Sequence, residues 1–168
     1  MRTMKGILGF AAFWILVCGL RAAEPPDVES RVAGAVKSQR ITVVHFWAPW
    51  CSNCKAELGK EGWPAFINAH PEVDFIFVTV WRSDAEDGRA LLEKYGVGAQ
   101  KNFQLLVHPN NARAPAKRVS RFLGLPLTWI PATWIFKEGE LRFALNYGEL
   151  RFPMLRQFVE DAGPNWDR

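Results

Sequence analysis

Two cysteines stand three positions apart in a segment that is rich in tryptophan. Residues 47–54 read Trp-Ala-Pro-Trp-Cys-Ser-Asn-Cys, so Cys51 and Cys54 would share one face of a helix that starts at Cys51. At a helix N-terminus, a thiol meets unpaired backbone N–H groups and the positive end of the helix dipole, and both stabilise its thiolate. The spacing therefore favours thiol–disulfide exchange, in which one thiolate attacks and a second thiol resolves the mixed disulfide.

A cysteine pair can also form a structural disulfide or bind a metal ion, and the sequence supports these alternatives to different degrees. A structural disulfide across two intervening residues would restrict the unfolded chain very little. A zinc site needs four ligands, and without a second Cys-x-x-Cys the three histidines, His45, His70 and His108, would have to converge on the pair. A Cu(I) site made by two thiolates and an imidazole is the stronger rival, because soft ligands suit that ion.

The chain begins with the pattern of an export segment. Two basic residues precede an uncharged run over residues 7–20, which fits the apolar core of a signal peptide and is short for a membrane span. We expect residues 1–23 to be a signal peptide or an N-terminal membrane anchor; lipidation at Cys18 is a third alternative. Residues 24–27 would be a linker, and residues 28–168 would form the domain outside the cytoplasm, in the periplasm or its equivalent.

The export segment accounts for most of the net charge. The chain carries 21 basic and 17 acidic residues, and the segment holds Arg2, Lys5 and Arg21 but no acid, which leaves 18 basic against 17 acidic residues. This balance excludes the basic footprint of a nucleic-acid-binding protein. In an oxidising compartment, a lone cysteine pair would rest as a disulfide unless a reductant recharges it.

Apolar patterns predict the elements that must position the cysteines. We expect strands over 41–47, 73–81, 103–107, 132–136 and 141–146, and helices over 28–38, 51–69, 84–95, 112–122 and 152–162. Gly59, Gly62 and Pro64 should interrupt the second helix. The first strand is almost wholly apolar and therefore central. Strands that alternate with helices and end in a hairpin and a helix predict a single α/β domain with a central mixed β-sheet flanked by helices.

Three separated motifs resemble the thioredoxin superfamily, and within it the exported TlpA/ResA-like thiol–disulfide oxidoreductases. The first is residues 46–57, which contain Trp-Cys-x-x-Cys. The second is residues 129–140, in which Trp-Ile-Pro leads into a strand and a glycine hairpin. The third is Gly148, followed by the last helix. The resemblance covers residues 28–163 and implies a thioredoxin fold that exchanges disulfides of proteins outside the cytoplasm.

The resemblance also implies roles for the matching residues. Cys51 would be the nucleophile and Cys54 the resolving thiol of a redox disulfide. Pro131 would follow a cis peptide bond and lie against that disulfide. The backbone of Ile130 would pair with an extended substrate segment, as an edge strand does. Trp50 would shield the sulfurs and, with Trp129, border the site where a protein substrate binds.

The sequence departs from the family pattern near the cysteines. His45 occupies the position where many thioredoxins keep a buried aspartate; it could accept the Cys54 proton, or it could be a neutral histidine in the core. The Ser52-Asn53 pair between the cysteines leaves the direction of electron flow open. Glu57 matches an acid that the TlpA/ResA-like branch often keeps, which favours a reductant; an ordinary solvated glutamate is the alternative.

These observations predict a thiol–disulfide oxidoreductase that reduces exported proteins, as in cytochrome c maturation. The alternatives are a disulfide oxidant and a copper metallochaperone, although copper-delivering relatives usually have three residues between the cysteines. We expect no cofactor or metal and no nucleic acid. The partners would be protein disulfides and an upstream membrane thiol reductase, with membrane contact only through an uncleaved N-terminus. Four basic residues of the 112–122 helix should form a solvated face or, in an anchored protein, face anionic lipid: Arg113, Lys117, Arg118 and Arg121.

Overall fold

The computed structural model describes residues 27–81, 87–109, 112–146 and 150–163. The predicted export segment, nearly all of the predicted linker and Gly148 lie outside these residues, so what we expect of them stays a prediction. Within the described part of the chain, no helix is both long enough and apolar enough to cross a membrane.

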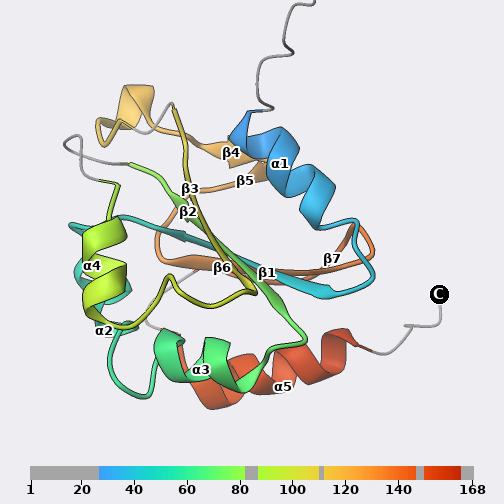
Figure 1. The fold of residues 1–168 in the computed structure, drawn as a ribbon. Helices are drawn as coiled ribbons and strands as arrows, with labels where there is room; N and C mark the ends of the chain where they lie inside the picture. Colours follow the sequence, from blue (N-terminus) through green and yellow to red (C-terminus); the bar gives the residue numbers. More distant parts are fainter. Residues whose placement is uncertain (1–26, 82–86, 110–111, 147–149, 164–168) are drawn as a thin grey trace, which may run out of the picture.

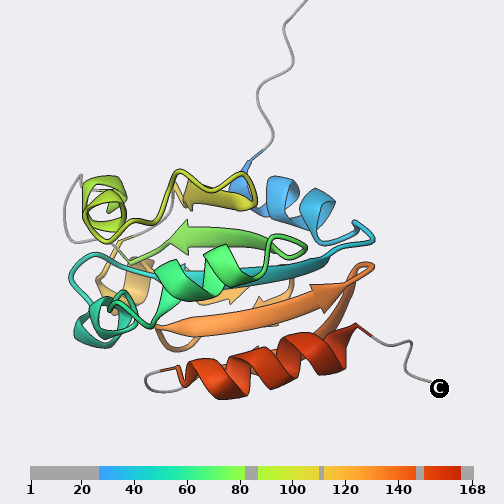
Figure 2. The same cartoon turned by 60° about the horizontal axis from the view of Figure 1, so that its bottom comes forward.

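A mixed sheet of five strands forms the centre of the domain (Figures 1 and 2). Its strands are β1 (Ile41–Trp47), β2 (Asp74–Thr79), β3 (Phe103–Val107), β6 (Ala132–Lys137) and β7 (Glu140–Leu145). In space they follow the order β3-β2-β1-β6-β7, with β1, β2 and β3 parallel and with β6 antiparallel to both β1 and β7. The apolar β1 is central and almost completely buried, which confirms the predicted mixed sheet.

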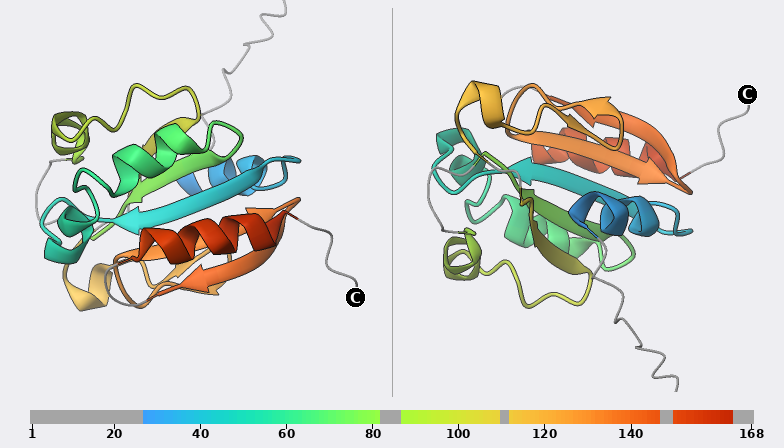
Figure 3. Two further views of the ribbon diagram at one scale, coloured as in Figure 1. Left: turned by 90° about the horizontal axis from the view of Figure 1, so that it is seen from below. Right: turned by 90° about the horizontal axis from the view of Figure 1, so that it is seen from above.

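Helices and a small hairpin cover the two faces of this sheet. The helices α3 (Trp63–Ala69) and α5 (Phe152–Ala162) lie over one face, whereas α1 (Val28–Ala35) and the hairpin of β4 (Arg121–Phe122) and β5 (Leu125–Pro126) lie over the other (Figure 3). Successive side chains of β1 alternate between these layers. The ring of Phe46 lies 4.9 Å from that of Phe122 in the hairpin, and the ring of His45 lies 4.7 Å from that of Trp63 in α3.

The helix expected over 51–69 is broken, as its glycines and proline predict. It consists of α2 (Ser52–Ala56) and α3, with Pro64 in the first turn of α3. At the break, the Trp63 N–H donates to the Glu57 carbonyl at 2.9 Å, and a Cβ on Gly62 would lie only 2.0 Å from that same oxygen. Glycine at position 62 therefore allows the chain to turn tightly behind the cysteine pair.

The prediction of a helix over residues 112–122 is wrong. A 3-10 turn, η1 (Pro115–Lys117), replaces its middle, and its end belongs to the β4–β5 hairpin, which Gly124 closes with a φ of 74°. Pro115 has no N–H to donate within a helix. Furthermore, the Val119 carbonyl accepts a hydrogen bond from the Trp81 indole, and Phe122 is fully buried. Tertiary contacts thus override the local pattern.

The helix expected over 84–95 begins later than its sequence suggests. Residues 82–86 lie outside the described residues, and α4 spans Arg89–Lys94. Gly88 precedes α4 with a φ of 84°, and a Cβ there would lie 2.4 Å from the ring of Trp47. The Asp87 carboxylate accepts a hydrogen bond from the Arg89 N–H at 2.9 Å. The expected end at Gly96, whose φ is 79°, is confirmed.

Candidate redox site

The two cysteines form a disulfide at the carboxyl end of the central strand. A short loop after β1 carries the chain to Cys51, which is the N-cap residue of α2, and the two Cα atoms lie 5.2 Å apart. The Cys51 Sγ accepts a hydrogen bond from the Cys54 backbone N–H at 3.2 Å. Both residues are nearly buried, Cys51 at 5% exposure and Cys54 at 1%. A backbone N–H at the start of α2 therefore points at the Cys51 sulfur, and such a donor stabilises a thiolate.

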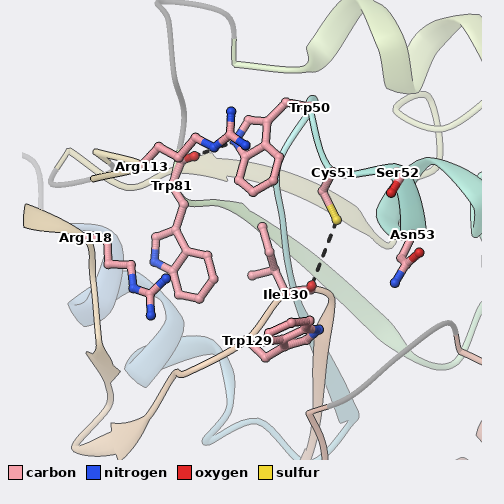
Figure 4. A pocket seen from close by; sticks show the side chains of 9 residues that line it. All are labelled: Trp50, Cys51, Ser52, Asn53, Trp81, Arg113, Arg118, Trp129 and Ile130. Atoms are coloured by element: carbon pink, nitrogen blue, oxygen red, sulfur yellow. Dashed lines mark hydrogen bonds between the residues drawn. The ribbon is translucent and has the colours of Figure 1, made fainter. Parts of the chain in front are cut away.

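The loop before β6 brings a second motif against the disulfide. The Ile130–Pro131 peptide bond is cis, and the Ile130 carbonyl oxygen lies 4.0 Å from the Cys51 Sγ (Figure 4). The antiparallel register of β1 and β6, in which Phe46 lies opposite Ala132, carries this loop to the same end of the sheet as Cys51. Trp129, next in the loop, is 49% exposed. Two motifs about eighty positions apart thereby meet at one site.

A cavity of about 290 Å³ opens beside Cys51. The residues that line it come from four segments of the chain: Trp50, Cys51, Ser52, Asn53, Trp81, Arg113, Arg118, Trp129 and Ile130 (Figure 4). Cys54 is not among them, so the cavity presents only one of the two sulfurs. Ser52 and Asn53 are exposed at its mouth.

Two tryptophans and two arginines form one wall of this cavity. The Trp50 indole N–H donates to the Trp81 carbonyl at 2.6 Å, and the Trp81 indole N–H donates to the Val119 carbonyl at 2.7 Å. The Arg113 guanidinium lies 4.0 Å from the centre of the Trp50 ring, and that of Arg118 lies 4.6 Å from the Trp81 ring. These are cation–π distances.

Sequence patterns do not predict this wall. Trp81 belongs to the segment expected as a strand over 73–81; it is buried, but it lies beyond β2 with a φ of 52° and faces the cavity. Of the four basic residues expected on a solvated helix face, Arg113, Lys117 and Arg121 are exposed and Arg118 is partly buried. Arg113 and Arg118 line the cavity, whereas Lys117 and Arg121 do not. No spacing in the sequence connects Trp81 with a loop that begins thirty residues later.

His45 is a core residue of the central strand β1. Its side chain is 1% exposed, its Nδ1 lies 2.9 Å from the Thr133 hydroxyl, and its Nε2 lies 3.5 Å from a Glu57 carboxylate oxygen. The rings of Trp63 and Phe77 each lie 4.7 Å from the imidazole. This burial lowers the pKa of His45 from its ordinary value of 6.5 to about 3. The imidazole is therefore neutral near pH 7.

Glu57 is buried, and the alternative that it is a solvated residue of the helix surface is wrong. It is only 2% exposed. One of its carboxylate oxygens accepts from the Trp63 indole N–H at 3.0 Å, and the other accepts from the Leu150 backbone N–H at 2.8 Å. Glu57 thereby joins the end of α2 to the starts of α3 and α5, and it faces His45 across the core.

The other histidines do not join the cysteines. His70 follows α3 and lies 3.1 Å from the Glu72 carboxylate, and the ring of His108, after β3, lies 6.0 Å from that of Phe122. Among the described residues, no three His, Cys, Asp or Glu side chains gather in a group that could hold a metal ion. The convergence that a zinc site would require is therefore missing from this part of the chain.

Comparisons with known proteins agree with this geometry. A model of the thioredoxin family matches residues 28–117. Sporulation thiol-disulfide oxidoreductase A of Bacillus subtilis (strain 168) is 35% identical over 120 residues, which cover 71% of this chain and 67% of that protein.

Solved structures show the same fold at lower sequence identity. A secreted disulfide oxidoreductase of Mycobacterium tuberculosis, homologous to E. coli DsbE, superposes with a TM-score of 0.54 and 23% identity over 76% of this chain and 86% of the other. The exposed lipoprotein thioredoxin Etrx1 of Streptococcus pneumoniae gives a TM-score of 0.51 and 20% identity over 77% and 89%. The chain therefore belongs to the thioredoxin superfamily, and it is a thioredoxin-like thiol–disulfide oxidoreductase.

Proposed function

We propose that this protein reduces disulfides of other proteins outside the cytoplasm, with Cys51 as the attacking thiol and Cys54 as the resolving thiol. One observation carries this assignment: Cys51 lines the cavity beside Ile130, and Cys54 is buried behind it. A substrate disulfide in the cavity therefore meets the Cys51 sulfur first.

The exchange proceeds in two steps that move two electrons to the substrate. The Cys51 thiolate attacks one sulfur of the substrate disulfide, that disulfide breaks, and the departing sulfur leaves as a thiolate that takes a proton from solvent. The Cys54 thiolate then attacks the Cys51 sulfur of the mixed disulfide. The Cys51–Cys54 disulfide forms, and the second substrate thiol is released. The oxidised product is the state that the structure shows.

The loop around Pro131 would hold the substrate during this exchange. The Ile130 backbone lies beside Cys51, where an extended segment could pair with it as a strand pairs with a sheet edge. Trp129, half exposed, and Trp50 offer apolar surface on the two sides of the sulfur. These contacts support the roles that the family resemblance implies for Trp50, Trp129, Ile130 and Pro131.

Proton transfer from Cys54 would involve the polar groups in the core. His45 as the acceptor stays a proposal, and its lowered pKa means that it would hold such a proton only transiently. The Thr133 hydroxyl, which is hydrogen-bonded to Nδ1, and the Glu57 carboxylate, which lies 3.5 Å from Nε2, are the groups that would set the orientation of the imidazole.

The sequence supports the proposed direction of electron flow and the proposed location. Glu57 favours a reductant by resemblance, and the pattern of residues 1–23 favours export. In an oxidising compartment, an upstream membrane thiol reductase would have to recharge the pair. The terms "secreted" and "exposed lipoprotein" describe two of the structural relatives and support the same location. Maturation of cytochrome c is one process that uses such a reductant.

Trapping of the mixed disulfide tests this function. Cys54→Ala, produced with its N-terminal segment in its native compartment, should capture substrate proteins through Cys51, and Cys51→Ala should capture none. A reduction potential near −270 mV would support a reductant, whereas one near −120 mV would show an oxidant. Failure of Cys54→Ala to capture any protein, together with stoichiometric Cu(I) binding that needs both cysteines, would instead support the metallochaperone.

A further inference from the structure

The cavity beside Cys51 carries two positive charges. Both come from the loop between β3 and β4, whose residues Arg113 and Arg118 reach back over the two tryptophans of the wall (Figure 4). Of the described residues that line the cavity, none is acidic. The surface that meets a substrate disulfide is therefore cationic, even though the chain without its export segment is nearly neutral.

Both guanidiniums lie over tryptophan rings at cation–π distance and keep N–H donors for a ligand. A guanidinium carries five N–H donors, more than a contact with one ring face can use. Within the described part of the chain, neither Arg113 nor Arg118 forms an ion pair or donates a hydrogen bond. A planar fork of this kind matches a carboxylate, which it can bind through two parallel hydrogen bonds.

The wall that holds these arginines is fixed before any substrate arrives. Two hydrogen bonds, from Trp50 to the Trp81 carbonyl and from Trp81 to the Val119 carbonyl, connect three segments. These are the loop before Cys51, the end of β2 and the loop between β3 and β4. Trp81 is almost completely buried, and Arg118 is partly buried beside it. Preorganised groups lose little conformational entropy when a ligand binds.

We propose that the cavity selects protein disulfides whose cysteine is flanked by acidic residues. With the substrate backbone against Ile130 and its sulfur at Cys51, the side chains next to the substrate cysteine fall over the tryptophan wall, where a carboxylate meets Arg113 or Arg118. An extended peptide fits better than a small disulfide, because exposed Trp129 provides further apolar surface beyond the sulfur. This inference rests on the proposed exchange function and names its substrate class.

Matched peptide substrates test the proposal. Two fluorogenic peptides would carry the same internal disulfide, flanked by aspartates in one and by asparagines in the other. In single-turnover reactions, the reduced full-length protein should reduce the aspartate peptide with about a 10-fold higher second-order rate constant, a difference that corresponds to 1.4 kcal/mol. Raising NaCl from about 50 to 300 mM should shrink this ratio, since partly exposed charges are screened by salt.

Arginine variants locate the source of the preference. The double variant Arg113→Gln/Arg118→Gln should bring the ratio close to one, and Arg113→Lys/Arg118→Lys should keep part of it, since lysine preserves the charge without the fork. Lys117→Gln is the matched control, because Lys117 lies between the two arginines but does not line the cavity. It removes one neighbouring positive charge, against two in the double variant, and should leave most of the ratio. Near-UV circular dichroism would verify that each variant keeps its tryptophan environment.

Each outcome separates this inference from the function on which it rests. Equal turnover of both peptides by the wild type would overturn the preference and leave the exchange function intact, whereas turnover of neither would overturn the exchange function itself. Loss of the ratio in Lys117→Gln as well would show a general charge effect and contradict the proposed contact. Glutathione disulfide is the third substrate to be tested. If the arginine substitutions slow only its reduction and not that of the peptides, the cavity binds small anionic disulfides and the peptide proposal fails.

Discussion

Replacement of His45 should change how the stability of this protein depends on pH. In the unfolded chain the imidazole has an ordinary pKa near 6.5, and burial lowers the folded-state pKa to about 3. Between these two values the unfolded state binds a proton that the folded state does not, so stability falls as the pH falls through this window. Above pH 6.5 the imidazole is neutral in both states, and it adds no pH dependence.

The size of the effect follows from the two pKa values. Between pH 7.5 and pH 4.5, protonation of the unfolded His45 costs the folded state about 3 kcal/mol, and the loss approaches about 5 kcal/mol below pH 3. A domain of this size has a free energy of unfolding of roughly 5–15 kcal/mol, so the effect is large enough to measure.

Urea unfolding of the oxidised protein provides the assay. The free energy of unfolding would be measured at pH 7.5, 6.0 and 4.5 from tryptophan fluorescence for the wild type and for His45→Asn. Asparagine keeps a polar group near Thr133 and carries no proton that titrates, so the carboxylates common to both proteins cancel in the difference. His45→Asn should be less stable at pH 7.5, and its stability should decline less steeply toward pH 4.5. Parallel pH profiles for the two proteins would refute the reasoning. They would show that His45 binds the same number of protons in the folded and the unfolded state between pH 4.5 and 7.5.

Two further predictions concern the segment behind the cysteines. Gly62→Ala should destabilise the fold by roughly 1–3 kcal/mol, since its Cβ would collide with the Glu57 carbonyl. Gly34→Ala, an exposed helix position with open space around it, should instead be neutral or stabilise by up to about 1 kcal/mol in the same thermal melts; equal losses would contradict the contact. Glu57→Leu leaves the Trp63 indole and the Leu150 N–H without their acceptor and should cost about 2–3 kcal/mol by urea unfolding. Glu57→Gln, which keeps one acceptor oxygen, should lose less, and a greater loss in Glu57→Gln than in Glu57→Leu would contradict this account.

The elements with strong local patterns could be predicted closely. The bounds of β1, β3 and α5 match those expected from the sequence, because a continuous apolar run, a bounded short strand and an amphipathic helix are each specified by nearby residues. The break between α2 and α3 could also be predicted, since Gly62 and Pro64 disfavour a continuous helix through their own backbone properties. The loop that carries Arg113 and Arg118 could not be predicted, because basic residues at helical spacing are equally compatible with a loop held by distant partners.

The amino-acid sequence by itself determined the class of chemistry. Cys51 and Cys54 are close in the chain, so their spacing and their place at the start of α2 depend on few distant contacts. The tertiary structure alone decided what surrounds them. The hydrogen bond between buried Glu57 and Leu150, and the cation–π contacts of Arg113 and Arg118 with Trp50 and Trp81, join segments that are far apart in the chain. Such contacts depend on how the sheet and its loops pack in three dimensions, and no local pattern of residues encodes them.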